Sequence, residues 1–136
     1  SPGTVLNSII QGSAADVIKV VLSEIGDQML SHKDFKDVKP LLQVHDEIIF
    51  EAPRPIAEKA AIVIKYAMER PWFDLSVPIL ASVKVCRHWG EMHDDDVPEI
   101  GIAPRSKDIK PAVLSLSDEQ EAIGMKYIRN IKSYSA

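Results

Sequence analysis

Two short apolar runs on either side of a polar tripeptide constrain the fold of this chain more than any other feature. Residues 41–44 read LLQV and residues 48–50 read IIF, with His45, Asp46 and Glu47 between them. Runs of this kind around a tight polar turn are typical of a β-hairpin. Their apolar residues would lie on both faces of the strands, which predicts strands in the middle of a covered sheet. We therefore expect residues 41–51 to form an antiparallel hairpin with an acidic tip.

Helical patterns lie before and after this hairpin. Residues 13–31 carry apolar side chains every three or four positions, which predicts one buried stripe along a helix with Ser13 as its N-cap. Pro55 suits the first turn of a second helix over residues 55–69. Residues 77–85 alternate between apolar and other side chains, as in a strand with one buried face. The order helix, hairpin, helix, strand predicts an α+β fold, in which an antiparallel sheet has its helices on one covered side.

The composition changes after residue 93. Three consecutive aspartates at 94–96 and prolines at 98, 104 and 111 indicate an acidic, proline-rich arm over residues 94–116. Ser117 followed by Gln120 is a capping box, which predicts a final helix within residues 117–136. The apolar stripe of that helix can be buried only by docking, so we expect an interaction element outside the core. The chain is thus expected to have three parts: residues 1–93, 94–116 and 117–136.

Composition limits the classes of protein that this chain can belong to. With 136 residues, 46% of them apolar, the chain can bury one ordinary core. Its 20 acidic and 16 basic residues give a net charge of −4, so the basic surface needed to hold nucleic acid must come from elsewhere. Cys86 is the single cysteine, which rules out a disulfide within the chain. No apolar run reaches the roughly 18 residues of a membrane span. We expect a cytoplasmic protein with no membrane partner.

The acidic tip of the hairpin is the candidate site for chemistry. A carboxylate at a turn between buried strands is held rigidly and still reaches solvent, as an oxygen ligand of Mg²⁺ must. Adjacent residues of a strand point to opposite faces, so Asp46 and Glu47 can converge on one ion only if the turn breaks that alternation. We therefore expect Asp46 to dominate any metal site here.

Three segments in order resemble motifs of the family A DNA polymerases, the bacterial DNA polymerase I type. Residues 44–51 read VHDEIIFE, similar to the family pattern VHDE(L/I)-x-(F/L)-E. Residues 7–19 read NSIIQGSAADVIK, which resembles the family's N-x-P-x-Q-G-(T/S)-A-A-D segment. Residues 77–80 read VPIL and precede Val83, Val85 and Trp89, as in the family's closing strand. The resemblance covers residues 5–93 and implies the C-terminal half of the polymerase palm subdomain.

The resemblance also implies an activity and roles for five residues. The activity is template-directed transfer of a deoxynucleotide from a deoxynucleoside triphosphate to a primer 3′-hydroxyl, with two Mg²⁺ ions in the complete site. Asp46 matches the second of two metal-binding aspartates, and Glu47 matches the carboxylate beside it. His45 matches a residue at the primer terminus. Asn7 and Gln11 match side chains that probe the minor groove of the primer–template DNA.

Other features of the family are missing or changed in these residues. Ile9 stands where the family has a proline. Gly3 stands where the family usually has an arginine, and the loss of that arginine suggests that residues 1–6 lie at or near a chain junction. The resemblance implies a further polymerase part with the first catalytic aspartate, the fingers and the thumb, so the isolated chain is expected to be inactive. Because these residues do not contain that part, three origins of the chain remain open. It can be a fragment, a separately encoded half of a split polymerase, or one half of a precursor joined by an intein.

Other readings of the sequence also remain open. The residues after 93 exceed the usual family length and would suit a virus-encoded enzyme, located in the host cytoplasm. A non-catalytic palm-like module, which assembles with a partner or binds DNA, is an alternative to catalysis. An unrelated metal-dependent phosphohydrolase that uses His45 and Asp46 is another.

Overall fold

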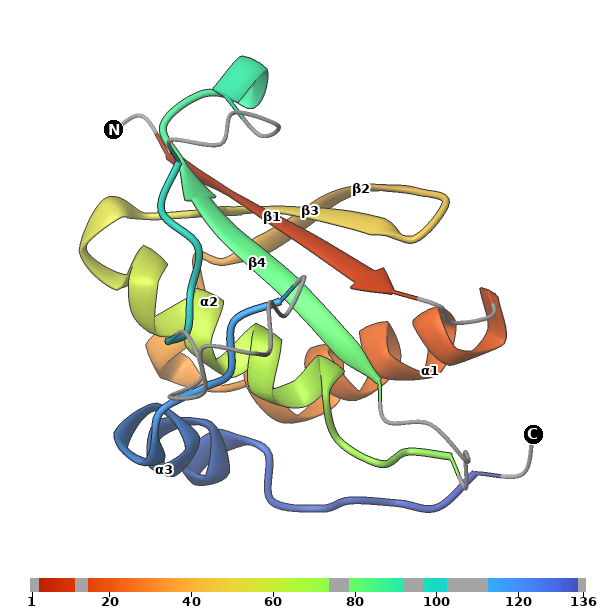
Figure 1. Cartoon of the computed structure of the whole chain (residues 1–136). Coiled ribbons are helices and arrows are strands. Elements are labelled where there is room, and N and C mark those ends of the chain that lie inside the picture. The colour runs from red at the N-terminus through yellow and green to blue at the C-terminus, as the bar shows by residue number, and fades with distance from the viewer. Residues whose placement is uncertain (1–2, 12–14, 74–78, 92–96, 103–112, 135–136) are drawn as a thin grey trace.

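A four-stranded antiparallel sheet organises the protein. The computed structural model describes residues 3–11, 15–73, 79–91, 97–102 and 113–134. The strands are β1 (Thr4–Gln11), β2 (Lys39–Val44), β3 (Glu47–Ala52) and β4 (Leu80–Cys86). They lie in the order β2-β3-β1-β4, and every neighbouring pair is antiparallel (Figure 1).

Two helices cover one face of this sheet (Figure 1). They are α1 (Ala15–Ile25), which continues as a π-helical turn at Gly26–Leu30, and α2 (Arg54–Met68). A third helix, α3 (Asp118–Tyr127), follows later in the chain. Single 3₁₀ turns lie at Lys33–Phe35 and Trp89–Glu91. The α+β class, the hairpin and its covering helices are confirmed, whereas the predicted cap Ser13 lies outside the described residues.

Strand β1 is the main element that the sequence analysis did not anticipate. It lies between β3 and β4, and it pairs with both over most of its length. Leu6, Ser8 and Ile10 are each 0% exposed on the face toward the helices. Alternation with a period of two was therefore present, but the polar residues Asn7 and Ser8 obscured it. The observed order is strand, helix, hairpin, helix, strand.

The expectation that both hairpin strands lie inside a covered sheet is wrong for β2. All six residues of β2 are exposed, and the strand forms an edge of the sheet. β3 lies inside the sheet, and its residues Ile48, Ile49 and Phe50 are buried. The apolar run of β2 therefore leaves Leu41, Leu42 and Val44 as exposed side chains. Such an edge is a surface on which a further strand could pair.

A charged pair lies inside the apolar layer between α2 and β4. Lys65 of α2 is 0% exposed, and its ammonium lies 3.3 Å from the Glu69 carboxylate. The same ammonium donates a hydrogen bond to the carbonyl of Ala81 in β4, whose N–H donates to Glu69. Burial lowers the pKa of Lys65, and the neighbouring carboxylate of Glu69 opposes that effect. This arrangement fixes α2 on β4 at one register.

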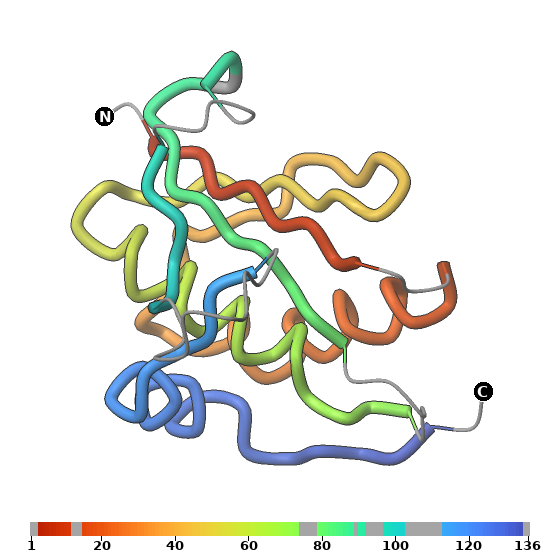
Figure 2. Tube along the Cα trace, viewed as in Figure 1, coloured from red at the N-terminus to blue at the C-terminus, as the bar shows by residue number. Residues whose placement is uncertain are grey.

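The segment after the last strand lies against the sheet and does not form a free arm. Ile100 donates its N–H to the carbonyl of Val83, and Val85 donates to the carbonyl of Pro98. Residues 97–101 thus line the edge of β4, as the path of the tube shows in Figure 2. Residues 103–112 of the expected arm lie outside the described part of the chain.

The C-terminal helix is confirmed, with the predicted capping box between Ser117 and Gln120. The expectation that it stays outside the core is wrong, because α3 packs on α2 of the same chain and Tyr127 and Ile128 belong to the main apolar cluster. The docking surface that its apolar stripe required is α2 itself.

The residues after α3 run back along α1 and its π-helical turn (Figure 2). The Gln28 side-chain oxygen accepts hydrogen bonds from the backbone N–H groups of Arg129 and Asn130, at 2.9 Å each. Tyr134 donates its hydroxyl proton to the buried carboxylate of Glu24 at 2.8 Å. These polar contacts hold the C-terminal residues on the helical layer.

Among the described residues, no helix has the length and apolar character needed to cross a bilayer. The cytoplasmic location stays a prediction.

Candidate active site at the hairpin turn

The tip of the hairpin is a two-residue loop. Val44 of β2 pairs with Glu47 of β3, which leaves His45 and Asp46 as the loop residues. His45 has a φ of 55°, in the left-handed region that tight hairpin loops require at their first position. Asp46 therefore lies in the turn rather than in a strand. The strict alternation that would separate Asp46 from Glu47 does not apply there.

Strand β1 holds this turn in place. Ile10 donates its backbone N–H to the carbonyl of Asp46 at 2.9 Å. The next residue of β1, Gln11, is exposed and is the last residue of the strand. The pairing between β1 and β3 thus brings Gln11 to the same end of the sheet as His45 and Asp46. Gln11 and Asp46 are far apart in the sequence, and the strand order of the sheet brings them to the same end.

The predicted site residues share the sheet face that is turned away from the helices. Asn7 pairs with Ile49, and Ile9 pairs with Glu47, so the side chains of these four residues lie on that face. Gln11 lies on it too, two residues after Ile9. Exposure differs within the group: His45, Asp46 and Gln11 are exposed, Glu47 is half-buried and Asn7 is only 1% exposed. In this arrangement the Gln11 side chain is open to solvent, and Asn7 is covered.

The donor chemistry of the turn fits a hard cation. Asp46 and Glu47 supply carboxylate oxygens, the ligand type that Mg²⁺ prefers, and the turn places Asp46 in solvent. Within the described part of the chain, no three His, Cys, Asp or Glu side chains cluster to hold a metal. The turn therefore provides carboxylates from one structural element.

A known protein family matches the part of the chain that contains this sheet. The model of DNA polymerase family A matches residues 3–91, which include β1, the hairpin and β4. The chain belongs to DNA polymerase family A. The matched residues end before the segment 97–101, α3 and the C-terminal residues that follow.

Individual relatives match over the same part of this family A chain. DNA polymerase I of Lactococcus lactis subsp. lactis is 41% identical over 88 residues, 65% of this chain and 10% of the relative. DNA polymerase I of Borreliella burgdorferi is 38% identical over 88 residues, 65% of this chain and 9% of the relative. DNA polymerase theta of Drosophila melanogaster is 34% identical over 97 residues, 68% of this chain and 5% of the relative. The chain therefore spans about a tenth or less of these relatives. No solved structure gives a significant match.

Proposed function

We propose that this family A chain is the C-terminal part of a polymerase palm and takes part in DNA-directed nucleotidyl transfer. The observation that carries the proposal is the pair of adjacent carboxylates, Asp46 and Glu47, at a turn that β1 holds rigidly, within residues that match the family. A rigid carboxylate at a solvent-facing turn is what metal-dependent phosphoryl transfer requires of a protein.

Each exposed residue at this end of the sheet has a proposed role. Asp46, with Glu47 beside it, would hold Mg²⁺, two ions in the complete site. The ions supply activation of the primer 3′-hydroxyl and stabilisation of the leaving oxygen of the deoxynucleoside triphosphate. His45 would hydrogen-bond the primer terminus, since its ring projects from the turn itself. Gln11 would donate its amide to minor-groove acceptors, which are present at every base pair.

We further propose that catalysis needs the remaining polymerase parts, with the first aspartate, the fingers and the thumb. The turn provides metal-binding carboxylates from one structural element only. The net charge of −4 does not favour binding of duplex DNA by the isolated chain. The exposed edge strand β2, with Leu41, Leu42 and Val44, is the surface on which the rest of the polymerase would pair. The isolated chain is therefore expected to bind primer–template DNA weakly and to extend no primer.

A chimeric enzyme tests the catalytic role. Residues 3–91 would replace the matching segment of the Lactococcus lactis DNA polymerase I, which is 41% identical to this chain over 88 residues. Primer extension with Mg²⁺ and deoxynucleotides should fall to background for Asp46→Asn, which removes a charge and keeps the shape. The matched control is Asp37→Asn, because Asp37 is an exposed carboxylate outside the hairpin. Normal extension by the Asp46→Asn chimera would refute the catalytic reading.

The same chimera tests Gln11. Gln11→Ala should reduce extension most from a mismatched primer terminus, because it deletes a probe of base-pair shape rather than a metal ligand. If the Gln11→Ala chimera extended matched and mismatched termini as well as the unsubstituted chimera does, Gln11 would not belong to the site. If the unsubstituted chimera binds DNA and extends no primer, the non-catalytic module becomes the better account.

A further inference from the structure

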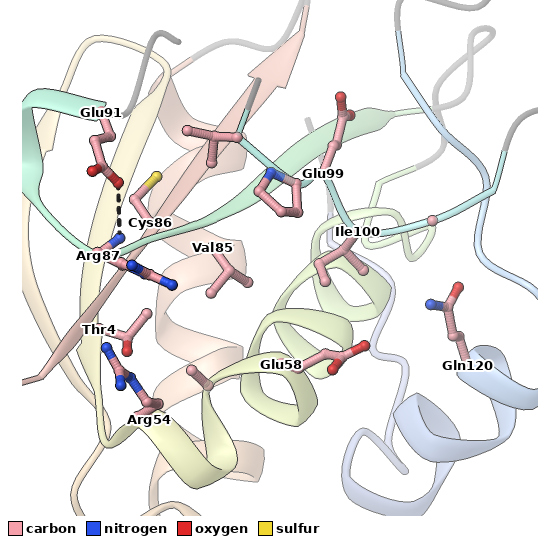
Figure 3. A pocket seen from close by; sticks show the side chains of 14 residues that line it. Thr4, Arg54, Glu58, Val85, Cys86, Arg87, Glu91, Glu99, Ile100 and Gln120 are labelled. Atoms are coloured by element: carbon pink, nitrogen blue, oxygen red, sulfur yellow. Dashed lines mark hydrogen bonds between the residues drawn. The ribbon is translucent and has the colours of Figure 1, made fainter. Parts of the chain in front are cut away.

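A cavity of about 730 Å³ lies at the opposite end of β1 from the hairpin turn. It opens between the edge of β4, the first turns of α2 and residues 97–101 (Figure 3). Thr4, the first residue of β1, lines it, whereas the turn adjoins Gln11 at the far end of the strand. Seven residue steps at about 3.3 Å separate the two ends by about 23 Å. The cavity is therefore distinct from the proposed polymerase site.

One end of this cavity is cationic. Arg54, the first residue of α2, and Arg87, which follows β4, both line it, and Figure 3 shows their guanidinium groups on the same side. Neither has a carboxylate at ion-pair distance among the described residues. The positive end of the α2 dipole faces the same region, and no acidic residue stands in the first turn of that helix.

The Thr4 hydroxyl lies at the cationic end, where a ligand in the cavity can reach it. Thr4 is 7% exposed, and no hydrogen bond of its hydroxyl is found in the described part of the chain. Figure 3 shows that hydroxyl on the side of Arg54. Such a hydroxyl can donate a hydrogen bond to an acceptor oxygen of a ligand. A bound oxyanion between Thr4 and the two arginines would provide one.

Three carboxylates also line the cavity, and one of them, that of Glu91, lies at the cationic end. The Glu91 carboxylate accepts the backbone N–H of Arg87 at 3.3 Å, and the Glu99 carboxylate accepts the Ser82 hydroxyl at 2.8 Å. Glu58 extends toward Gln120, away from Arg54 (Figure 3). One end of the cavity thus has two arginines and one carboxylate, and the other end has acceptors for a hydrogen-bond donor.

An apolar middle joins these two ends. Val85, Pro98 and Ile100 line it. A planar, weakly polar body fits between such side chains, and the volume lies in the range usual for small-molecule sites, about 300–1,000 Å³. The three parts of the cavity together define the order of groups in a ligand: an oxyanion, a flat body and an amino group.

We propose that this cavity binds a nucleoside monophosphate whose base carries an exocyclic amino group, such as AMP. The phosphate lies against Arg54, Arg87 and the Thr4 hydroxyl, because guanidinium groups bind phosphate oxygens through paired N–H donors. The base lies in the apolar middle, and its amino group donates to Glu58. The proposal does not depend on the polymerase function.

Isothermal titration of the 136-residue chain tests this site with AMP, UMP, adenosine and inorganic phosphate as probes. AMP should bind at least tenfold more tightly than adenosine or inorganic phosphate. Arg54→Met and Arg87→Met should each weaken AMP binding about tenfold, and Thr4→Val should weaken it several-fold. The matched control is Arg129→Met, an exposed arginine outside the cavity. Glu58→Gln should reduce the preference for AMP over UMP.

Several results would overturn the proposal. Equal affinity for AMP and adenosine would show that the cationic end binds no phosphate. If Arg54→Met and Arg87→Met reduced AMP affinity no more than Arg129→Met does, the arginines would contribute only non-specific charge attraction. Absence of AMP binding at millimolar concentration would refute the site outright. Circular dichroism identifies any variant that misfolds, in which case Thr4→Val, a nearly isosteric change, carries the test. Asp46→Asn should leave AMP binding unchanged, which separates this site from the polymerase turn.

Discussion

Gly124 tests whether the C-terminal helix belongs to the folding unit. It lies in α3, and a Cβ atom added there would come closer to the Tyr66 ring and Cβ of α2 than real Cβ atoms approach. The near part of a tyrosine side chain cannot move far without its backbone, so α3 must shift away from α2. Gly26, in the π-helical turn, is the matched control because a Cβ there would meet nothing within 4 Å.

The expected effect is the difference between two terms. Replacing a helical glycine by alanine stabilises a helix by about 1 kcal/mol, and this term acts in both variants. Overpacking a buried contact costs about 1–3 kcal/mol, and this term acts only at Gly124. We therefore expect Gly124→Ala to have a free energy of unfolding about 1–3 kcal/mol lower than that of Gly26→Ala. Gly26→Ala should be at least as stable as the unsubstituted chain.

Urea unfolding followed by circular dichroism measures this difference. With an m-value of about 2 kcal/mol/M, a difference of 2 kcal/mol separates the two midpoints by about 1 M. Gly124→Ala should cost less in a Tyr66→Ala background than in the unsubstituted chain, as expected for two residues in contact. If Gly124→Ala were as stable as Gly26→Ala, α3 would not pack on α2 as described, and the C-terminal helix would lie outside the core.

Three further substitutions test separate parts of the structure. Burial raises the pKa of the Glu24 carboxyl, but hydrogen bonds from Tyr134 and Gln28 outweigh this effect, so the net pKa is lowered. The stability that Glu24 contributes is therefore fully present above its ordinary pKa. It is lost as the pH falls through the lowered pKa. Urea midpoints of Glu24→Gln and the unsubstituted chain should therefore differ at pH 7 and converge once the pH has fallen below the lowered pKa, and a constant difference would contradict this. Lys65→Met should lower the free energy of unfolding by about 3 kcal/mol, because it leaves Glu69 without its buried partner, and adding Glu69→Gln should restore part of it; an unchanged urea midpoint would refute the role of the pair. His45→Val should destabilise the chain by about 1–2 kcal/mol relative to His45→Gly, since a β-branched residue is strained at a φ of 55°, and equal melting temperatures of the two variants would exclude the left-handed turn.

Local patterns in the sequence were sufficient to predict the elements that follow one regular period. The helical stripe after Ala15, the alternation through β4 and the capping box at Ser117 each depend on residues within a few positions of one another. The motif at residues 44–51 also identified the turn and its family, because the polar tripeptide and the apolar runs around it are adjacent in sequence. These predictions required no knowledge of what each element packs against.

The pairing of distant segments could not be predicted in this way. β1 is central because β3 and β4, which are far from it in the sequence, pair with it on either side. β2 has the same apolar character as β3, yet it is exposed because no further strand of the described residues pairs with its outer edge. Lys65 and Glu24 are charged residues, which the sequence alone would place on the surface. Lys65 is buried with a partner in β4, and Glu24 is buried with partners among the C-terminal residues.

The sequence by itself determined the periodicity of the helices, the hairpin with its carboxylates and membership of the polymerase family. The tertiary structure alone decided that Gln11 lies at the same end of the sheet as Asp46, that Asn7 is covered, that α3 packs on the core, and that Thr4, Arg54 and Arg87 line one cavity. The physical reason is that periodicity reflects which side of an element is apolar, whereas proximity depends on which elements pair. Pairing is set by the free energy of the whole packed chain, and no single segment carries that information.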